Sequence, residues 1–145
     1  MEISPNQPIK VFSLENILDL CNQLVKKIGT GPSDTWKLWG IPRNGLIIAG
    51  LMAHCGELEI RMSQPFSPAF IDPHTLVVDD IHDSGKTLTP YIMRGMPTAT
   101  LFWRKKNGPK PTFFVETIED DTWVVFPWEK ERIITPRRRY YESNN

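Results

Sequence analysis

The stretch LVVDDIHDSGKTL, residues 76–88, decides how this chain of 145 residues is expected to fold. It begins with apolar, partly β-branched residues, which are typical of a buried strand. Asp79 and Asp80 end the apolar run, and the loop from Asp83 to Thr87 follows before a helical pattern begins. In open α/β sheets, ligands bind beyond the carboxyl ends of the strands. The stretch therefore predicts a strand, a ligand-binding loop and the start of a helix.

Each part of this stretch has a chemical use. A loop of Ser, Gly and Thr lets backbone N–H groups approach a phosphate, and the following helix N-terminus adds unpaired donors and a favourable dipole. The carboxylates of Asp79 and Asp80 can accept hydrogen bonds from sugar hydroxyls or help to hold Mg²⁺. Asp83 can act as a general base if a substrate proton lies within reach. Three acids beside such a loop favour a ligand site over acids that merely cap a turn.

The rest of the chain alternates between strand-like and helix-like segments. Ser13 is expected to cap a helix that ends before Gly29, and the proline-rich segment 64–73 should be irregular or edge-like. Strands are expected at 36–41, 58–62, 75–78, 98–103, 112–115 and 123–126, and helices at 14–28, 46–55 and 87–94. This alternation predicts an α/β fold with a parallel sheet flanked by helices. We expect one domain over 1–145, with a core at about 13–129 and a C-terminal extension at 130–145.

Composition and charge exclude several functional classes. Lys plus Arg is 17 and Asp plus Glu is 17, so the balanced charge argues against a broad nucleic-acid-binding surface. No run approaches about 18 apolar residues, so no membrane partner is expected. The polar N-terminus, Met1 to Lys10, does not read as a secretory signal. Cys21 and Cys55 form no paired motif, which favours reduced thiols and a cytoplasmic location.

The triplet Gly85-Lys86-Thr87 admits a second interpretation as the end of a phosphate-binding P-loop. That motif requires a glycine five residues before Gly85. The residue at that position is Asp80, whose carboxylate would face the phosphates. The P-loop interpretation is therefore weak.

Residues 77–87 instead resemble the motif with which type I phosphoribosyltransferases bind phosphoribosyl pyrophosphate (PRPP). The segment Ile41 to Gly45 is similar to the pyrophosphate loop of that family. The segment Asp121 to Glu129, with its Asp-Thr-Trp and Pro-Trp pairs, resembles the base-binding end of the bacterial xanthine-guanine phosphoribosyltransferases. Together these segments cover most of residues 36–129 and narrow the resemblance to enzymes that act on 6-oxopurines.

The resemblance implies an enzyme of purine salvage. The reaction would transfer 5-phosphoribosyl from PRPP to guanine, xanthine or hypoxanthine with Mg²⁺, releasing pyrophosphate. It also implies a small C-terminal hood over the base and a homo-oligomer, either a dimer or a tetramer.

The resemblance also assigns residues to the PRPP site. Asp79 and Asp80 would bind the ribose hydroxyls and contact Mg²⁺, directly or through water. Asp83 would be the catalytic acid/base near purine N7. The 5′-phosphate would lie on the loop Asp83, Ser84, Gly85, Lys86 and Thr87, and the pyrophosphate on Arg43, Asn44 and Gly45.

The purine assignment is less complete. Trp123 would stack on the base, and the carbonyls of Trp123 and Val124 would face its 2-position. The family's lysine for the purine O6 falls at Arg104 by a gapless count, or at Lys105 by chemical similarity, and both stay open.

The sequence departs from the family at three places. Asn44 stands where a glycine is usual, and Lys86 where a small residue is usual. The segment Met62 to Thr75 has only 14 residues, where the family places a longer mobile lid. A shortened flexible lid and an open pocket are therefore expected. His82, in the variable position of the motif, is expected to line the mouth of that pocket.

A non-catalytic relative is the alternative from another functional class. Such a protein would keep the phosphate loop but bind a nucleotide, or bind RNA through the Arg137–Tyr141 tail, as a regulator. Asp83, Trp123 and the acid pair are all present, which favours the enzyme.

Overall fold

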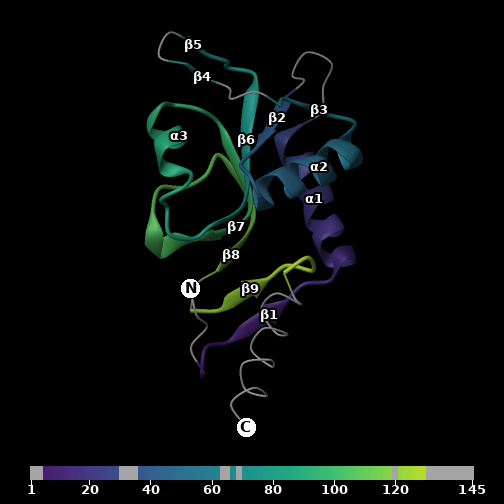
Figure 1. The fold of residues 1–145 in the computed structure, drawn as a ribbon, viewed down its shortest axis with the longest axis vertical. Helices are drawn as coiled ribbons and strands as arrows, with labels where there is room; N and C mark the ends of the chain where they lie inside the picture. The colour runs from purple at the N-terminus through teal and green to yellow at the C-terminus, as the bar shows by residue number, and fades with distance from the viewer. Residues whose placement is uncertain (1–4, 30–35, 63–65, 68–69, 119–120, 130–145) are drawn as a thin grey trace, which may run out of the picture. The chain divides into compact units, whose positions relative to one another are not determined.

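The computed structural model describes residues 5–29, 36–62, 66–67, 70–118 and 121–129 (Figure 1). The chain divides into two compact units. The larger unit runs from Leu18 to Glu119, and the smaller one combines Met1–Ile17 with Asp120–Asn145. The C-terminal extension at 130–145, with its Arg137–Tyr141 tail, lies outside the described residues.

A five-stranded sheet of order β3-β2-β6-β7-β8 is the framework of the larger unit. All four strand pairs in it are parallel, and α-helices lie in the connections that follow β2 and β6. The strands are β2 (Lys37–Gly40), β3 (Glu59–Ile60), β6 (Thr75–His82), β7 (Thr98–Arg104) and β8 (Phe113–Ile118). The expected α/β fold, a parallel sheet flanked by helices, is confirmed.

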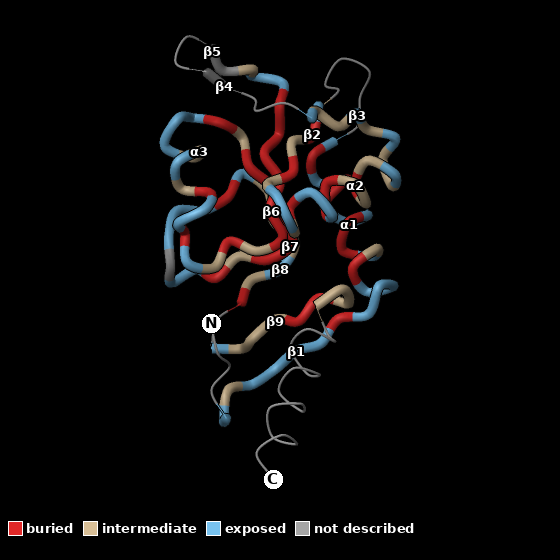
Figure 2. The backbone as a smooth tube through the Cα atoms, in the orientation of Figure 1, coloured by how far each residue is buried: buried red, intermediate tan, exposed pale blue. Residues whose placement is uncertain are grey.

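The central strand β6 is buried on both faces, as Figure 2 shows by its colour. Val77 packs with Leu88 and Met96, and α3 (Thr89–Met93) lies on this side of the sheet. Because side chains alternate along a strand, Leu76 and Val78 point to the opposite face. Figure 1 shows α1 and α2 on that other side of β6. The hydrophobic run at the start of β6 is explained by these two layers.

The first helix, α1 (Leu14–Ile28), begins where the sequence predicts. The backbone N–H of Asn16 donates to Ser13 Oγ at 3.1 Å, and the N–H of Ser13 donates to Asn16 Oδ1 at 3.1 Å. This reciprocal cap satisfies donors that the first turn would otherwise leave unpaired. The apolar spacing then buries one stripe of the helix, including Ile17 and Leu24.

The second helix, α2 (Asn44–Gly56), packs on β2 and β6 and is apolar on nearly every side. Ile48 and Met52 are fully buried, but Leu46 and Ile47 are 40% and 38% exposed. The prediction of a buried helix is thus right for one face and wrong for the other.

Several element ends differ from the sequence-based expectation. Strand β6 does not end at Val78 but continues through the two acids to His82, because β7 pairs with it as far as His82 and Trp103. Strand β8 likewise runs on to Ile118 beside β7. The helix expected at 87–94 shortens to the five residues of α3, with Pro90 in its first turn as predicted.

The segment from Met62 to Thr75, where the short lid is expected, includes a short antiparallel hairpin. Its strands are β4 (Phe66–Ser67) and β5 (Phe70–Ile71). The sequence did not predict this pairing, since its prolines suggested irregular or edge-like backbone. Residues 63–65 and 68–69 lie outside the described ranges, so the flexibility of this lid stays a prediction.

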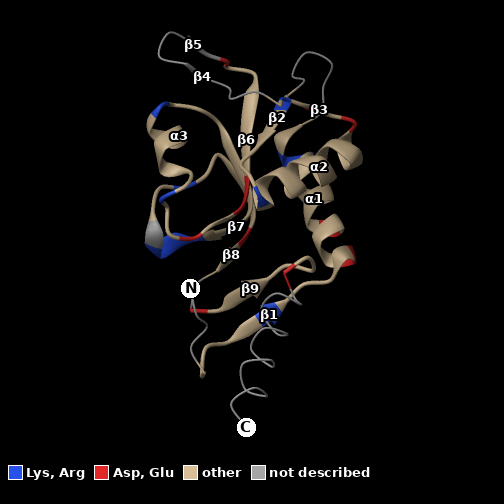
Figure 3. Cartoon of the chain, viewed as in Figure 1, with Lys and Arg blue, Asp and Glu red and all other residues tan. Residues whose placement is uncertain are grey.

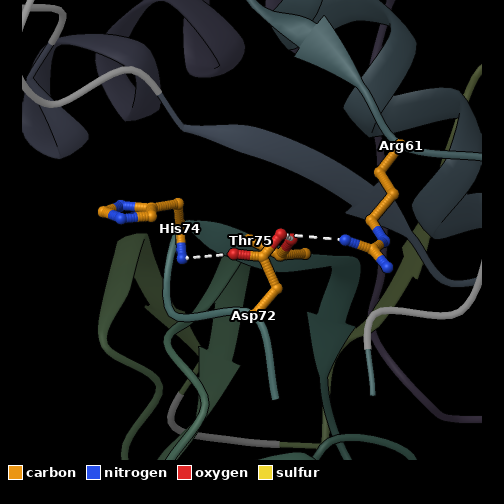
Figure 4. A network of polar contacts seen from close by, with 4 residues as sticks. All are labelled: Arg61, Asp72, His74 and Thr75. Carbon is orange, nitrogen blue, oxygen red and sulfur yellow. Dashed lines mark hydrogen bonds and ion pairs between the residues drawn. The ribbon is translucent and has the colours of Figure 1, made fainter. Parts of the chain in front are cut away.

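A network of polar contacts lies at the amino end of β6 and connects Asp72 with Arg61, His74 and Thr75 (Figure 4). Asp72 accepts hydrogen bonds from the backbone N–H of His74 at 2.9 Å, from Thr75 Oγ1 at 3.0 Å and from Arg61 Nη1 at 2.8 Å. These contacts hold the pKa of Asp72 below its ordinary value of 3.8, and the His74 N–H has the largest effect. The network lies at the opposite end of β6 from the two acids.

The smaller unit contains a two-stranded parallel ribbon. Strand β1 (Ile9–Val11) pairs with β9 (Trp123–Val125), and Ile9 lies opposite Trp123. The sequence predicted β9 but not β1, because the exposed residues of β1 carry no buried pattern and only the distant partner defines the strand. After β9, the rings of Phe126 and Trp128 stack at 5.2 Å between their centroids.

Candidate active site

Three loops meet at one edge of the larger unit's sheet. Because β2, β6 and β7 are adjacent and parallel, their carboxyl ends lie together. The loops that follow them are residues 41–43, 83–88 and 105–112. Figure 3 shows acidic positions at this end of β6 beside a basic position where α2 begins. The sequence-predicted PRPP residues and Arg104 all lie in or beside these loops.

The turn after β2 packs closely against β6. The backbone N–H of Ile41 donates to the Val78 carbonyl at 2.9 Å. A Cβ added at Gly45 would lie 2.5 Å from the same carbonyl oxygen, so only glycine fits there. Arg43 is exposed beside this turn. An exposed cation next to a close-packed turn is suited to meeting an anionic ligand.

Asp79 and Asp80 form a buried acid pair in β6, each 8% exposed. The N–H of Asp80 donates to Asp79 Oδ1 at 2.9 Å, and the N–H of Ile81 donates to Asp80 Oδ1 at 2.8 Å. Burial raises the pKa of Asp79 to about 8, and the neighbouring Asp80 carboxylate adds to that effect. The backbone hydrogen bonds therefore hold the pair rigidly. A ligand that donates hydrogen bonds to the pair, or places a positive charge beside it, would offset the cost of burying two acids next to each other.

The loop from Asp83 to Leu88 turns at a glycine. Gly85 has a φ of 82°, in the left-handed region that favours glycine. The Lys86 N–H lies 3.3 Å from Ser84 Oγ, which forms a local turn. Buried Leu88 fixes the end of the loop in the core. The helix that follows is only α3, so its dipole adds less than the sequence suggested and the loop amides matter more.

Asp83 pairs with Arg104, the last residue of β7. Arg104 Nε lies 2.6 Å from Asp83 Oδ1, and the two side chains are 10% and 44% exposed. Lys105, the other candidate for the purine O6, begins the following 3₁₀ turn, η1 (Lys105–Asn107), and is exposed. The structure thus brings Arg104 into contact with the candidate acid/base.

His82 is not at the mouth of the site, contrary to the sequence-based expectation. It is 2% exposed, and its pKa is lowered, chiefly by burial. A Cβ at Gly108 would lie 3.2 Å from His82 Nε2 and 3.5 Å from the Gly85 Cα. The loop after β7 therefore packs on His82 and Gly85, a support for the phosphate loop that no sequence signal indicated.

Trp123 and Val124 lie in the smaller unit, on β9, where both are half-buried. The N–H of Trp123 donates to the Pro8 carbonyl at 2.7 Å. Its indole Nε1 is buried, and within the described part of the chain it has no hydrogen-bond partner.

The acid pair supplies the donors that a magnesium ion prefers. Mg²⁺ is commonly held by one or two carboxylates together with substrate phosphates and water. Among the residues that the structure describes, no group of three or more His, Cys, Asp or Glu side chains could hold a metal alone. Asp79 and Asp80 therefore fit an ion that arrives with a phosphorylated substrate.

No helix in the described ranges is long and apolar enough to cross a membrane.

Solved structures with a similar fold include purine phosphoribosyltransferases and a hypothetical protein. A purine phosphoribosyltransferase from Pyrococcus horikoshii superposes with a TM-score of 0.65 at 21% identity, covering 83% of this chain and 93% of that one. A xanthine-guanine-hypoxanthine phosphoribosyltransferase from Helicobacter pylori gives 0.65 at 19% identity, covering 92% and 99%. A hypothetical protein from Neisseria gonorrhoeae with bound ppGpp gives 0.65 at 17% identity, covering 98% and 100%. At these identities the likeness establishes the fold.

Sequence similarity to curated proteins establishes the family. No protein-family model matches the chain. The xanthine-guanine phosphoribosyltransferase of Cereibacter sphaeroides is 30% identical over 128 residues, covering 70% of this chain and 74% of that protein. The enzyme of the same name from Roseobacter denitrificans is 37% identical over 57 residues, covering 37% and 32%. The chain therefore belongs to the xanthine-guanine phosphoribosyltransferase family and is an enzyme of the phosphoribosyltransferase class.

Proposed function

We propose that this enzyme transfers the 5-phosphoribosyl group of PRPP to a 6-oxopurine, which is guanine, xanthine or hypoxanthine. The products are the purine nucleoside 5′-monophosphate and pyrophosphate. One observation carries the proposal: Asp79, Asp80 and Asp83 lie between two glycine-containing turns at the carboxyl end of β6. The unpaired cysteine pattern supports a reducing compartment, and we propose the cytoplasm.

PRPP would lie across this edge of the sheet. The exposed loop of Ser84, Lys86 and Thr87, with Gly85 at its turn, would hold the 5′-phosphate through backbone N–H groups. The buried acids Asp79 and Asp80 would accept hydrogen bonds from the ribose hydroxyls. The turn carrying Arg43, Asn44 and Gly45 would hold the pyrophosphate.

The purine would be recognised by an aromatic ring, a backbone carbonyl and a basic side chain. Trp123 would stack on the base, and the Val124 carbonyl would face its 2-position. Arg104 or Lys105 would donate to the purine O6. We also propose that the enzyme works as a homo-oligomer and has no nucleic-acid or membrane partner.

The transfer is a displacement at C1 of the ribose. Purine N9 forms the new bond to C1 as the bond from C1 to the pyrophosphate oxygen breaks, and the electron pair leaves with pyrophosphate. Asp83 would hold the proton that the purine gives up, near N7. The Asp80 carboxylate would stabilise positive charge on the sugar ring, and Arg43 would stabilise the leaving anion. When bound, Mg²⁺ held by Asp79 and Asp80 would neutralise charge on PRPP.

The short segment between Met62 and Thr75 would seal this site poorly. Closing an active site excludes water from the reacting centre. With only 14 residues in this segment, water should reach C1 more readily than in a relative with a full lid. Slow hydrolysis of PRPP in the absence of a purine is the expected consequence.

The test is PRPP-dependent pyrophosphate release with guanine, xanthine and hypoxanthine in parallel, with adenine and orotate as controls. A reaction without base measures hydrolysis by water. Turnover with one or more 6-oxopurines, and none above the water reaction with the controls, is expected. Binding of PRPP without transfer to any base would favour the non-catalytic alternative and overturn the proposal.

A further inference from the structure

The side chain of Asn44 joins the turn after β2 to the acid pair. Asn44 is the first residue of α2, and its Nδ2 donates to Asp80 Oδ2 at 3.0 Å. The contact is half-buried and links residues 36 positions apart in the chain. It connects the candidate pyrophosphate turn with the candidate ribose acids.

This bond completes the support of one carboxylate. Asp80 Oδ1 accepts from the Ile81 N–H at 2.8 Å, and Asp80 Oδ2 accepts from Asn44. With a donor on each oxygen, the carboxylate plane of Asp80 is fixed by the protein before a ligand arrives. Fixing a polar group in advance removes the cost of ordering it when the ligand binds.

The backbone of the turn has supports of its own. The N–H of Ile41 donates to the Val78 carbonyl at 2.9 Å, and the N–H of Leu46 donates to the Ile41 carbonyl at 3.1 Å. Gly45 packs directly against the Val78 carbonyl. The amide group of Asn44 can therefore be removed while the turn stays in place.

We propose that Asn44 is a positioning residue: it orients Asp80 for the ribose and couples the pyrophosphate turn to the ribose acids. The inference rests on the proposed function. It predicts that the amide of Asn44 supports binding of every ligand that carries a ribose 5′-phosphate, whether or not that ligand carries a pyrophosphate. A direct contact from Asn44 to pyrophosphate predicts the opposite, namely a loss for PRPP alone.

The experiment compares the binding of GMP, which has no pyrophosphate, with the binding of PRPP by calorimetry. Asn44→Ala removes the donor, and Asn44→Asp keeps the shape but sets a second carboxylate against Asp80. Asn22→Ala, at an exposed position of α1, is the matched control. Thermal unfolding of each variant without ligand separates loss of orientation from loss of folding.

Asn44→Ala should weaken GMP and PRPP binding alike, by about tenfold, which is the scale of one hydrogen bond to a charged group. Asn44→Asp should weaken both ligands more than Asn44→Ala does, and Asn22→Ala should change neither. A role in packing alone predicts that Asn44→Ala lowers thermal stability but leaves GMP and PRPP binding by the folded protein unchanged, and that result would overturn the inference. So would a loss confined to PRPP.

The failure of the proposed function is distinguishable from the failure of this inference. A wild-type chain that binds neither GMP nor PRPP contradicts both. A wild-type chain that binds both, with Asn44→Ala equal to it, contradicts only the role of Asn44.

Discussion

Arg104 and Asp83 form an ion pair in which Arg104 Nε lies 2.6 Å from Asp83 Oδ1. The pair joins the end of β7 to the first residue after β6, because the register places Trp103 beside His82. The Arg104 side chain is nearly buried, whereas that of Asp83 is 44% exposed and open to a ligand. A buried guanidinium that holds an exposed carboxylate fixes the direction in which the carboxylate points.

The first prediction follows from this pair. Arg104→Gln should lower kcat by about tenfold or more, because a loosely held catalytic group spends less time in a productive geometry. Steady-state kinetics should be compared with those of Lys106→Gln, a change at the neighbouring exposed residue of η1. Equal kinetics for the two variants would mean that the ion pair does not organise the reaction.

The second prediction concerns the acid pair and stability. The pKa of Asp79 is raised from 3.8 to about 8, so the folded state binds this proton more tightly than the unfolded chain does. The stability that the proton supplies is present below pH 3.8 and is lost as the pH rises toward 8. Asp79→Asn should therefore be more stable than the wild type at about pH 9. The difference in unfolding free energy between Asp79→Asn and the wild type should be more favourable to the variant at about pH 9 than at about pH 5, by more than about 1 kcal/mol.

Urea unfolding of both proteins at the two pH values checks this effect. A constant difference between them would show that Asp79 ionises in the unliganded fold much as it does in the unfolded chain. The same substitution should weaken PRPP binding, which would make Asp79 a residue kept for function at the expense of stability.

The third prediction concerns Asp72 at the other end of β6. Its pKa is lowered from 3.8 by the His74 N–H and then by Thr75 and Arg61. Its stabilising effect is therefore present above pH 3.8 and is lost as the pH falls through the lower folded value. Asp72→Asn should cost about 1–2 kcal/mol near neutral pH, the scale of hydrogen bonds to a charged group, and less in acid.

Denaturant unfolding of the wild type and Asp72→Asn from neutral to acidic pH measures this difference. The network is far from the acid pair along β6, so PRPP binding by the variant should match the wild type once both are folded. A stability difference that does not shrink in acid would rule out the charge of Asp72 as its cause.

The fourth prediction concerns the base. Trp123→Ala should weaken binding of guanine or GMP by about 1–3 kcal/mol, the magnitude of stacking between a base and an aromatic ring. PRPP binding should change little, because Trp123 lies on β9 and not in the loops around β6. Calorimetry with each ligand is the measurement. Equal losses for GMP and PRPP would make Trp123 a structural residue.

Much of α1 and of the five-stranded sheet could be predicted from local patterns in the sequence. The cap at Ser13 and the apolar spacing after it define α1, and the apolar run before Asp79 identifies the buried strand. The end of β6 could not be predicted, because acids and a histidine are typical of loops. Pairing with β7 extends the strand through them to His82.

The site residues could be proposed from the sequence, but their contacts could not. The sequence indicated Asn44 as a candidate ligand of the pyrophosphate. In the structure its side-chain amide donates a hydrogen bond to Asp80, 36 positions away. Arg104 was an alternative for the purine O6, and the register of β6 and β7 sets it against Asp83. Strand β1 was missed for the same reason: its partner, β9, lies at the far end of the chain.

The most direct test of Asp83 as the acid/base compares the wild type with Asp83→Asn in the transfer of phosphoribosyl from PRPP to guanine. GMP binding is expected to be retained, while kcat falls by roughly 10²–10⁴-fold, the usual effect of removing a general acid/base. Rapid-quench measurement of a single turnover would place the loss in the chemical step. Unchanged turnover in Asp83→Asn would contradict the proposed mechanism, because the residue held by Arg104 at the end of β6 would then have no part in the chemistry.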